Sequence, residues 1–198
     1  MLSLLKADDQ GAGDIDGVPV IVRLNARLQP LDRGDIYEDP LAEALEATGL
    51  GAVTGAGTQL AEEGGIEFCD IDLALENADE ETLDRIVAAL EKLGAPKGSK
   101  LLYGESEERP FGKNEGLAIY LNGTDLPDDV YQTCDINHVI SEIDRLLEGV
   151  GGFQSYWEGP TETALYLYGE DAEKMRGLIA PFMASYALCQ QARIEQIA

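Results

Sequence analysis

The stretch LALENADEETLDRIVAAL, residues Leu73–Leu90, decides the fold because a second stretch of the chain matches it without a gap. That second stretch is LYLYGEDAEKMRGLIAPF, residues Leu165–Phe182. The matched pairs are Leu73 with Leu165, Leu75 with Leu167, Asp79 with Asp171, Leu83 with Met175, Ile86 with Leu178 and Leu90 with Phe182. Upstream, VIVRLN at Val20–Asn25 resembles LAIYLN at Leu117–Asn122 at a slightly different offset. Two matches in the same order predict a duplicated unit.

Each half of the chain shows the same order of secondary-structure signals. Alternating apolar and polar residues predict strands, and apolar stripes at helical spacing predict helices. In the first half we expect a strand at 18–28, a helix at 38–48, two strands at 51–60 and 64–75, a helix at 79–93 and a strand at 101–103. In the second half we expect strands at 117–122, 153–157, 163–168 and 193–197, and helices at 135–147 and 171–186. Pro181 falls inside the last helix, where a proline predicts a kink or an early end.

The order strand, helix, strand, strand, helix, strand resembles that of the ferredoxin-like fold. We therefore predict an α+β protein of two tandem ferredoxin-like units with antiparallel sheets, produced by an internal duplication. The expected boundaries are an N-terminal segment at 1–17, a first unit at 18–104, a linker at 105–115 and a second unit at 116–198. This resemblance in element order carries no information about function.

Charge is the strongest feature of the composition. The 198 residues include 38 acidic side chains against 14 lysines and arginines, for a formal net charge of −24. Phosphate contacts require a basic patch, so we expect neither nucleic acid nor an anionic membrane as a partner. An acidic surface accelerates the capture of a basic protein, which makes such a protein the expected partner. The alternative is that the acidity serves only solubility.

The sequence also indicates a location inside the cell. It contains no run of about 18 apolar residues, so we expect no membrane span. The first residues, MLSLLKADDQ, lack the basic start and the long apolar stretch of a secretory signal. The three cysteines, Cys69, Cys134 and Cys189, are odd in number and far apart, as free thiols in a reducing compartment are. We therefore expect a cytoplasmic protein.

The strand IEFCDIDLAL, Ile66–Leu75, places a thiol and two carboxylates close together in sequence. Alternation separates them, because Cys69 shares the inner phase of Leu73 while Asp70 and Asp72 share the opposite phase. Cys69 is therefore predicted to be a small core residue. A hard-cation site needs about six oxygen ligands, so Asp70 and Asp72 are predicted to face solvent or a partner.

His138 is the only histidine of the chain and follows Cys134 at helical spacing. Zinc requires four ligands, and the sequence supplies no second histidine or Cys-x-x-Cys pair to complete a set. No serine lies in a nucleophile-elbow motif that would use His138 as a base. We expect His138 to be a partly buried polar residue near a helix start, and we predict no catalytic residue, no metal and no cofactor.

Aromatic residues gather on the outer phase of the second unit, the phase opposite the helices. Tyr120, Tyr166 and Tyr168 share this phase, and either Tyr156 or Trp157 joins them from the adjoining strand. In the first unit the outer phase holds Arg23 and Asn25 beside Asp70 and Asp72. Exposed aromatics beside acids are typical of interfaces. The alternative is that the open faces of the two units cover each other.

Together these features favour binding over catalysis. We predict a non-enzymatic acidic protein that neutralises or regulates a basic protein partner, for example an immunity protein against a basic toxin. The expected partner contacts are Asp70, Asp72, Tyr120, Trp157, Tyr166 and Tyr168. The alternative function is a small-molecule sensor or a minor enzyme with a ligand held between the two units.

Overall fold

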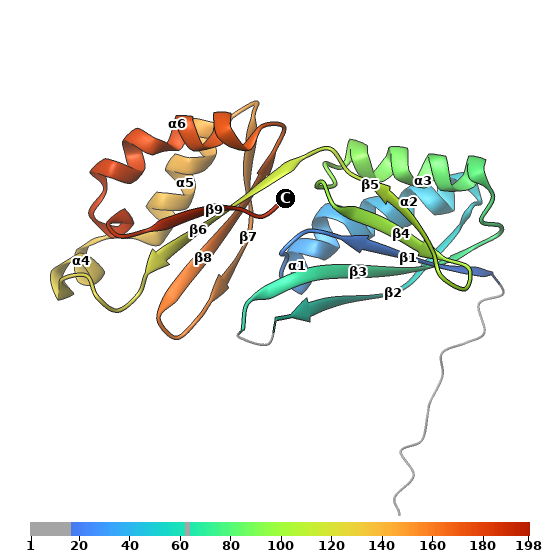
Figure 1. Ribbon diagram of the computed structural model, residues 1–198, viewed down its shortest axis with the longest axis horizontal. Helices are drawn as coiled ribbons and strands as arrows, with labels where there is room; N and C mark the ends of the chain where they lie inside the picture. Colours follow the sequence, from blue (N-terminus) through green and yellow to red (C-terminus); the bar gives the residue numbers. More distant parts are fainter. Residues whose placement is uncertain (1–16, 62–63) are drawn as a thin grey trace, which may run out of the picture.

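The computed structural model describes residues 17–61 and 64–198, and within them the chain forms two tandem ferredoxin-like units (Figure 1). Each unit is an antiparallel sheet with its helices gathered on one side (Figure 1). This is the fold predicted from the matched stretches. The descent of both units from one duplicated sequence stays a prediction. Among the described residues, no helix combines the length and the apolar character needed to cross a bilayer.

The first unit contains a five-stranded sheet in the order β2-β3-β1-β4-β5. Its elements are β1 (Val18–Leu24), α1 (Pro30–Arg33), a π-helical turn (Gly34–Glu38), α2 (Asp39–Thr48), β2 (Gly51–Leu60), β3 (Ile66–Leu75), α3 (Glu80–Lys92), β4 (Ser99–Tyr103) and β5 (Glu107–Phe111). The first four strands in this order form the ferredoxin-like sheet, and β5 extends it at one edge.

The second unit contains a four-stranded sheet in the order β7-β8-β6-β9. Its elements are β6 (Glu115–Asn122), α4 (Asp128–Thr133), α5 (Ile136–Leu147), β7 (Gly151–Glu158), β8 (Glu162–Gly169), α6 (Ala172–Ser185), a short 3₁₀ turn (Ala187–Cys189) and β9 (Arg193–Gln196). Strands β6, β7, β8 and β9 correspond to β1, β2, β3 and β4 of the first unit. The order β7-β8-β6-β9 is therefore equivalent to β2-β3-β1-β4, and the two units share one topology.

The two matched aspartates start equivalent helices. The carboxylate of Asp79 accepts a hydrogen bond from the backbone N–H of Thr82 at 2.9 Å, and that of Asp171 accepts one from Lys174 at 2.8 Å. Each carboxylate thereby satisfies a backbone donor that the first helical turn leaves unpaired. The hydrogen bond from Thr82 also lowers the pKa of Asp79. The sequence match therefore corresponds to a shared structural role at the start of α3 and α6.

Each unit buries its inner strand residues against its helices. In the first unit the inner rows of β1, β3 and β4 pack on α2 and α3 through Val20, Val22, Leu24, Ile71, Leu73, Leu101, Leu45, Leu83, Ile86 and Leu90. In the second unit β6 and β8 pack on α5 and α6 through Leu117, Ile119, Leu165, Leu167, Val139, Ile143, Met175 and Ile179. The outer rows of both sheets therefore do not contact the helices of their own unit.

The structure differs from the sequence-based expectations in several elements. The predicted linker, residues 105–115, contains β5, which pairs with β4 from Ser99↔Phe111 to Tyr103↔Glu107. The helix α6 does not end early at Pro181 but continues to Ser185. The short helices α1 and α4 were not predicted, because each is too brief to show an apolar stripe. The predicted N-terminal segment lies outside the described residues except for Gly17.

The segment between β1 and α1, in the first unit, packs against the second unit. We call residues 25–29 the strap. Its alternation of half-buried and buried residues continues that of β1, with Ala26 and Leu28 fully buried. The backbone N–H of Gln29 donates to Ser155 Oγ at 2.9 Å, and the Ser155 hydroxyl donates to a carboxylate oxygen of Asp32 at 2.6 Å. The strap therefore lies against the outer face of the second sheet.

Candidate functional site

The outer face of the second sheet is covered by the first unit. Tyr166 and Tyr168 are 1% and 2% exposed, and both belong to the hydrophobic core that also contains Ala26 and Leu28 of the strap. The backbone N–H of Arg27 donates to the Tyr168 hydroxyl oxygen at 2.8 Å. Burial raises the pKa of Tyr168, so its hydroxyl stays protonated.

The other two aromatics predicted as partner contacts also face the first unit. Trp157, not Tyr156, occupies the outer phase, since it pairs with Ala164 beside Tyr166. A Cβ atom added at Gly64, in the turn between β2 and β3, would lie 3.0 Å from the Trp157 ring. Arg27 donates to the Tyr120 hydroxyl at 2.8 Å, and the Arg193 guanidinium lies 4.3 Å from the Tyr120 ring centroid.

These contacts correct part of the sequence-based interpretation. Tyr166 and Tyr168 are not accessible to a protein partner, because they lie in the interface between the units. The sequence left open whether the outer aromatics contact a partner or are covered by the other unit. For Tyr166 and Tyr168, packing between the units is the alternative that the structure has. The cover consists of the strap and the β2–β3 turn, however, and not of the open face of the first sheet.

In the described part of the chain, no helix lies over the corresponding face of the first sheet. We call it the open face. Strand register places its central side chains in two rows that cross the sheet. The first row is Gly55, Asp72, Ile21, Leu102 and Glu108, and the second row is Gly57, Asp70, Arg23, Lys100 and Pro110. Of the residues with side chains in these rows, each is exposed or half-exposed.

The second row is held by ion pairs. Arg23 binds Asp70 through two hydrogen bonds of 2.9 and 2.7 Å, and its guanidinium lies 4.0 Å from the centroid of the Phe68 ring. The hydrogen bond to Asp70 is the largest cause that raises the pKa of Arg23. Asp70, predicted as a partner contact, is therefore already neutralised by Arg23.

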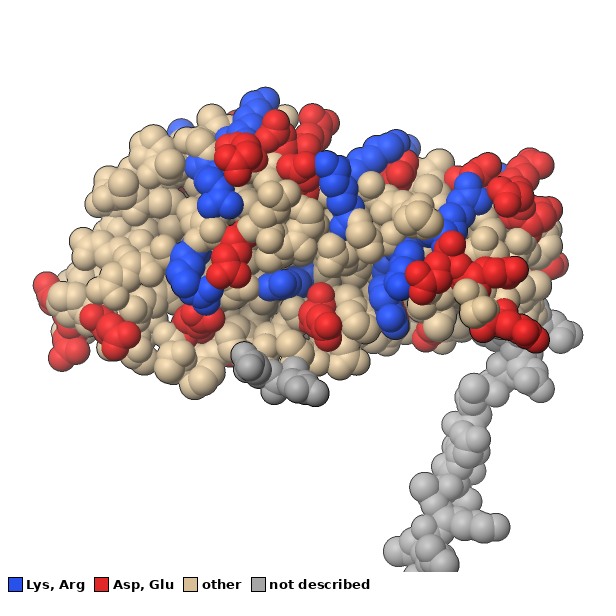
Figure 2. Space-filling model, in the orientation of Figure 1, with Lys and Arg blue, Asp and Glu red and all other residues tan. Residues whose placement is uncertain are grey.

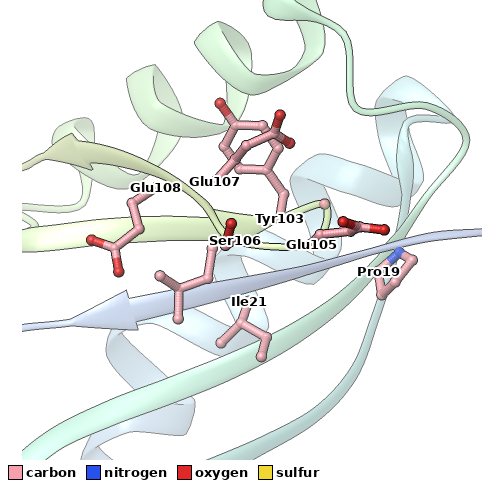
Figure 3. A pocket seen from close by; sticks show the side chains of 9 residues that line it. Pro19, Ile21, Tyr103, Glu105, Ser106, Glu107 and Glu108 are labelled. Carbon is pink, nitrogen blue, oxygen red and sulfur yellow. The ribbon is translucent and has the colours of Figure 1, made fainter.

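The first row combines apolar surface with carboxylates. Ile21 and Leu102 lie side by side at its centre, with Asp72 on one flank and Glu108 on the other. A shallow hollow of about 450 Å³ lies over this row, and its lining includes Pro19, Ile21, Leu102, Glu105 and Glu108. In Figure 3 Ile21 comes from β1 and Glu108 from β5, with β4 between these strands, while Glu105 lies in the turn that connects β4 and β5. The hollow is an apolar floor with an acidic rim.

Asp72 is the carboxylate of this row that is free to meet a ligand. Its side chain is exposed, and within residues 17–61 and 64–198 it takes part in no ion pair. A Cβ atom added at Gly55 would lie 3.1 Å from Asp72 Oδ2, so the carboxylate leans over the glycine toward the free edge of β2. Glu108, by contrast, binds Lys100 at 2.9 Å.

The remaining sequence candidates lie away from this face. Cys69 is fully buried, its Sγ lies 3.5 Å from the Leu28 carbonyl oxygen, and burial raises its pKa, as expected for an unreactive core thiol. Cys134 and His138 do not share a helix, because α4 ends at Thr133 and α5 begins at Ile136. His138 is exposed, contrary to expectation, and its ring lies edge-on to those of Phe182 and Tyr186. Within the described part of the chain, no three metal-ligating side chains gather at one place.

Comparisons with known proteins do not assign this chain to a family. No protein-family model and no curated protein sequence matches it. One similar solved structure is the regulatory subunit of aspartate kinase from Thermus flavus, with 14% identity over 84% of this chain and 94% of that chain and a TM-score of 0.28. A second is the first two RRM domains of yeast poly(U) binding protein, with 11% identity over 90% and 99% of the two chains and a TM-score of 0.24. A third is an anthrone oxidase-like protein, with 11% identity over 92% and 91% and a TM-score of 0.24.

Proposed function

We propose that this protein binds a basic protein partner through the open face of its first sheet and thereby neutralises or regulates that partner. An immunity protein against a basic toxin is the most concrete form of this function. The observation that carries the proposal is the pair Ile21 and Leu102, which is left uncovered between the carboxylates of Asp72 and Glu108.

The composition of the open face supports a protein ligand. Interfaces commonly combine an apolar centre with a polar rim, and the first row of the open face has this arrangement. The apolar centre supplies the contacts that exclude water, while the rim supplies orientation. Phe68 extends the apolar surface on β3, where Arg23 stacks on its ring. The open face therefore offers both anchoring and orienting contacts.

The charge of the molecule supports a basic ligand. The net charge is −24, and acidic side chains gather over the half of the molecule that holds the five-stranded sheet, with basic side chains among them (Figure 2). Glu105 in the turn from β4 to β5 and Glu107 at the start of β5 also line the hollow. A field of this sign attracts cations over roughly the 8 Å screening length at physiological salt.

The alternative function, a small-molecule site between the two units, gains no support from the described interface. At this interface Tyr166 and Tyr168 are 1% and 2% exposed. The cytoplasmic location inferred from the sequence remains part of the proposal, because an intracellular toxin or regulator would be met there.

The test begins with capture of binding proteins on the immobilised full chain at low and high salt, followed by rate measurements on each purified binder. We expect capture of the partner to slow as salt rises, because long-range attraction is screened. Replacing Ile21 and Leu102 together with alanine should speed release by about tenfold, because packed anchors control residence time.

The matched control is Tyr156→Ala, which removes an exposed aromatic from the second unit, outside the open face. This variant should bind as the original protein does. A binder whose capture ignores salt, or whose release ignores the change at Ile21 and Leu102 but responds to Tyr156→Ala, contradicts the proposal.

A further inference from the structure

We propose that the free edge of β2 accepts an extended basic segment as an additional strand of the five-stranded sheet, with a lysine or arginine of that segment bound by Asp72. The inference rests on the proposed function, because it states how the basic partner would engage the open face. It adds a mode of binding, a contact residue and a requirement on the partner, namely an extended stretch with cationic side chains at alternate positions.

The edge itself offers the backbone groups for strand addition. Among the described residues β2 has one strand neighbour, β3, so within residues 17–61 and 64–198 the backbone N–H and C=O groups on its other side have no strand partner. No residue of β2 is buried, and the strand contains neither a charged residue nor a proline. Charges and prolines are the usual means by which edge strands prevent pairing. The opposite edge, β5, carries both in its sequence EERPF.

Register limits the usable part of the edge. The β2–β3 ladder shifts between Val53 and Gly55 and again between Gln59 and Leu60, and it is regular from Gly55 to Gln59. A register shift bends the strand and interrupts regular pairing. The additional strand would therefore pair along residues 55–59, a length typical of short strands in sheets.

Two glycines give an added strand access to the carboxylates of the open face. Gly55 lies opposite Asp72 and Gly57 lies opposite Asp70, so no side chain of β2 stands between the edge and these residues. Asp72 leans over Gly55, with Oδ2 3.1 Å from the position of an added Cβ atom. Strands in a sheet lie about 4.8 Å apart, so a lysine or arginine on the added strand can extend across Gly55 to Asp72.

Charge complementarity selects a basic segment over a second copy of this chain. Pairing of two β2 edges would bring two molecules of net charge −24 together, with Asp72 of each copy near the new strand. Like charges close to one another across strands are destabilising. A cationic segment instead gains a charge-assisted hydrogen bond with one of these carboxylates. That carboxylate is Asp72, because Asp70 already binds Arg23.

The experiment uses the full chain and a short capped peptide of alternating lysine and threonine as the probe. Two versions of the peptide carry N-methyl groups on the backbone, one at the lysine nitrogens and one at the threonine nitrogens, so the charge is unchanged while one set of backbone donors is removed. A peptide of alternating glutamate and threonine reports nonspecific binding. Affinity is measured by fluorescence anisotropy, and amide exchange of residues 55–59 is measured with and without the peptide.

If the inference holds, one N-methylated version binds at least about tenfold more weakly, because its strand hydrogen bonds to β2 are lost. The unmodified peptide protects amides within residues 55–59 from exchange. Asp72→Asn weakens binding by about two- to fivefold, as expected for a partly exposed charge pair. Glu81→Gln removes one charge from an exposed position on α3 and changes the affinity by less than Asp72→Asn does.

Three results overturn the inference. Equal binding by all lysine peptides, without protection of residues 55–59, would show electrostatic capture alone and would leave the proposed function intact. Protection of these amides without peptide, increasing with protein concentration, would show that a second copy covers the edge. Binding of the lysine peptide no stronger than that of the glutamate peptide would overturn the inference together with the proposed basic partner.

Discussion

The two sheets have the same strand order, but their helix-free faces have opposite environments. On the second sheet the covered part of this face includes Ala118, Ala164, Tyr166 and Tyr168, and the strap packs against it. On the first sheet it consists of charged residues around Ile21 and Leu102, and no part of the described chain covers it. The same topology therefore supports an internal interface in one unit and a candidate binding surface in the other.

The difference arises from the segments that leave the equivalent first strands. After β1 the chain continues as the strap, whose buried Ala26 and Leu28 extend the alternation of the strand across the second unit. After β6 the chain turns at Gly123, whose backbone N–H donates to the Thr161 carbonyl oxygen at 2.8 Å. The segment after β1 therefore contacts the other unit, whereas the segment after β6 contacts its own unit.

The largest expected effect comes from removing a ring of the covered face. Tyr168→Ala should lower the free energy of unfolding by about 3–5 kcal/mol, the usual cost of deleting a buried aromatic side chain. Denaturation by urea measures this change. Tyr156→Ala is the control, because that ring is 46% exposed and its loss should cost less than about 1 kcal/mol. Equal effects of the two changes would show that the second face is not covered in solution.

A smaller effect is expected from removing only the hydroxyl of the same residue. Tyr168→Phe keeps the ring but leaves the backbone N–H of Arg27, a half-buried residue, without its acceptor. An unpaired buried donor costs about 1–3 kcal/mol, so the variant should be intermediate between the original protein and Tyr168→Ala. Exchange of the Arg27 amide should accelerate in parallel. An unchanged exchange rate would contradict the contact between the strap and Tyr168.

On the open face the strongest ion pair should contribute less than the buried hydroxyl does. Arg23→Met retains packing on Phe68 but removes the ion pair with Asp70, whose partners have side chains 33% and 25% exposed. Pairs of this exposure contribute about 0.5–1 kcal/mol, and salt weakens them. Thermal unfolding at low and high salt measures both quantities. A loss that does not shrink in high salt would indicate a packing effect instead.

The helix cap at Asp79 should lose its stabilising effect in acid. The N–H of Thr82 lowers the pKa of Asp79 in the folded protein, so the cap stabilises the fold above the unfolded pKa of this carboxyl and loses its effect as pH falls through the folded value. Asp79→Ala should therefore be less stable than the original protein at neutral pH and equally stable in acid. Unfolding curves at a series of pH values test this. A stability difference that persists in strong acid would contradict it.

The smallest effect on stability is expected at the exposed acid of the open face. Asp72→Asn should change the free energy of unfolding by no more than about 0.5 kcal/mol, since the carboxylate is exposed and unpaired among the described residues. Its effect should appear in the capture rate of a basic binder, which should fall relative to Glu81→Gln. Unchanged capture would place the binding surface away from the first row of the open face.

Sequence periodicity predicted most of the strands and helices because it reflects local geometry, and the resemblance of their order to the ferredoxin-like fold implied the topology. The matched apolar stripes predicted both units, the alternation around Cys69 predicted its burial, and the matched aspartates Asp79 and Asp171 lie at the same helix start. Short elements such as α4 escaped prediction, because six residues are too few to display a helical stripe. The strand β5 was missed because its three consecutive charged residues and its proline, in the sequence EERPF, resemble a polar linker.

The sequence by itself determined that five residues face away from the helices, Asp70, Asp72, Tyr120, Tyr166 and Tyr168, because a strand places alternate side chains on opposite faces. The pairing of β7 with β8 then placed Trp157, and not Tyr156, on the same phase. Only the tertiary structure decided which of them meet solvent. Tyr166 and Tyr168 are buried because the strap, more than a hundred residues earlier in the chain, lies across them. Asp72 remains exposed because no segment of the described chain lies across the open face of the first sheet. Alternation is a local property of the backbone, whereas the covering of a face depends on contacts between distant segments.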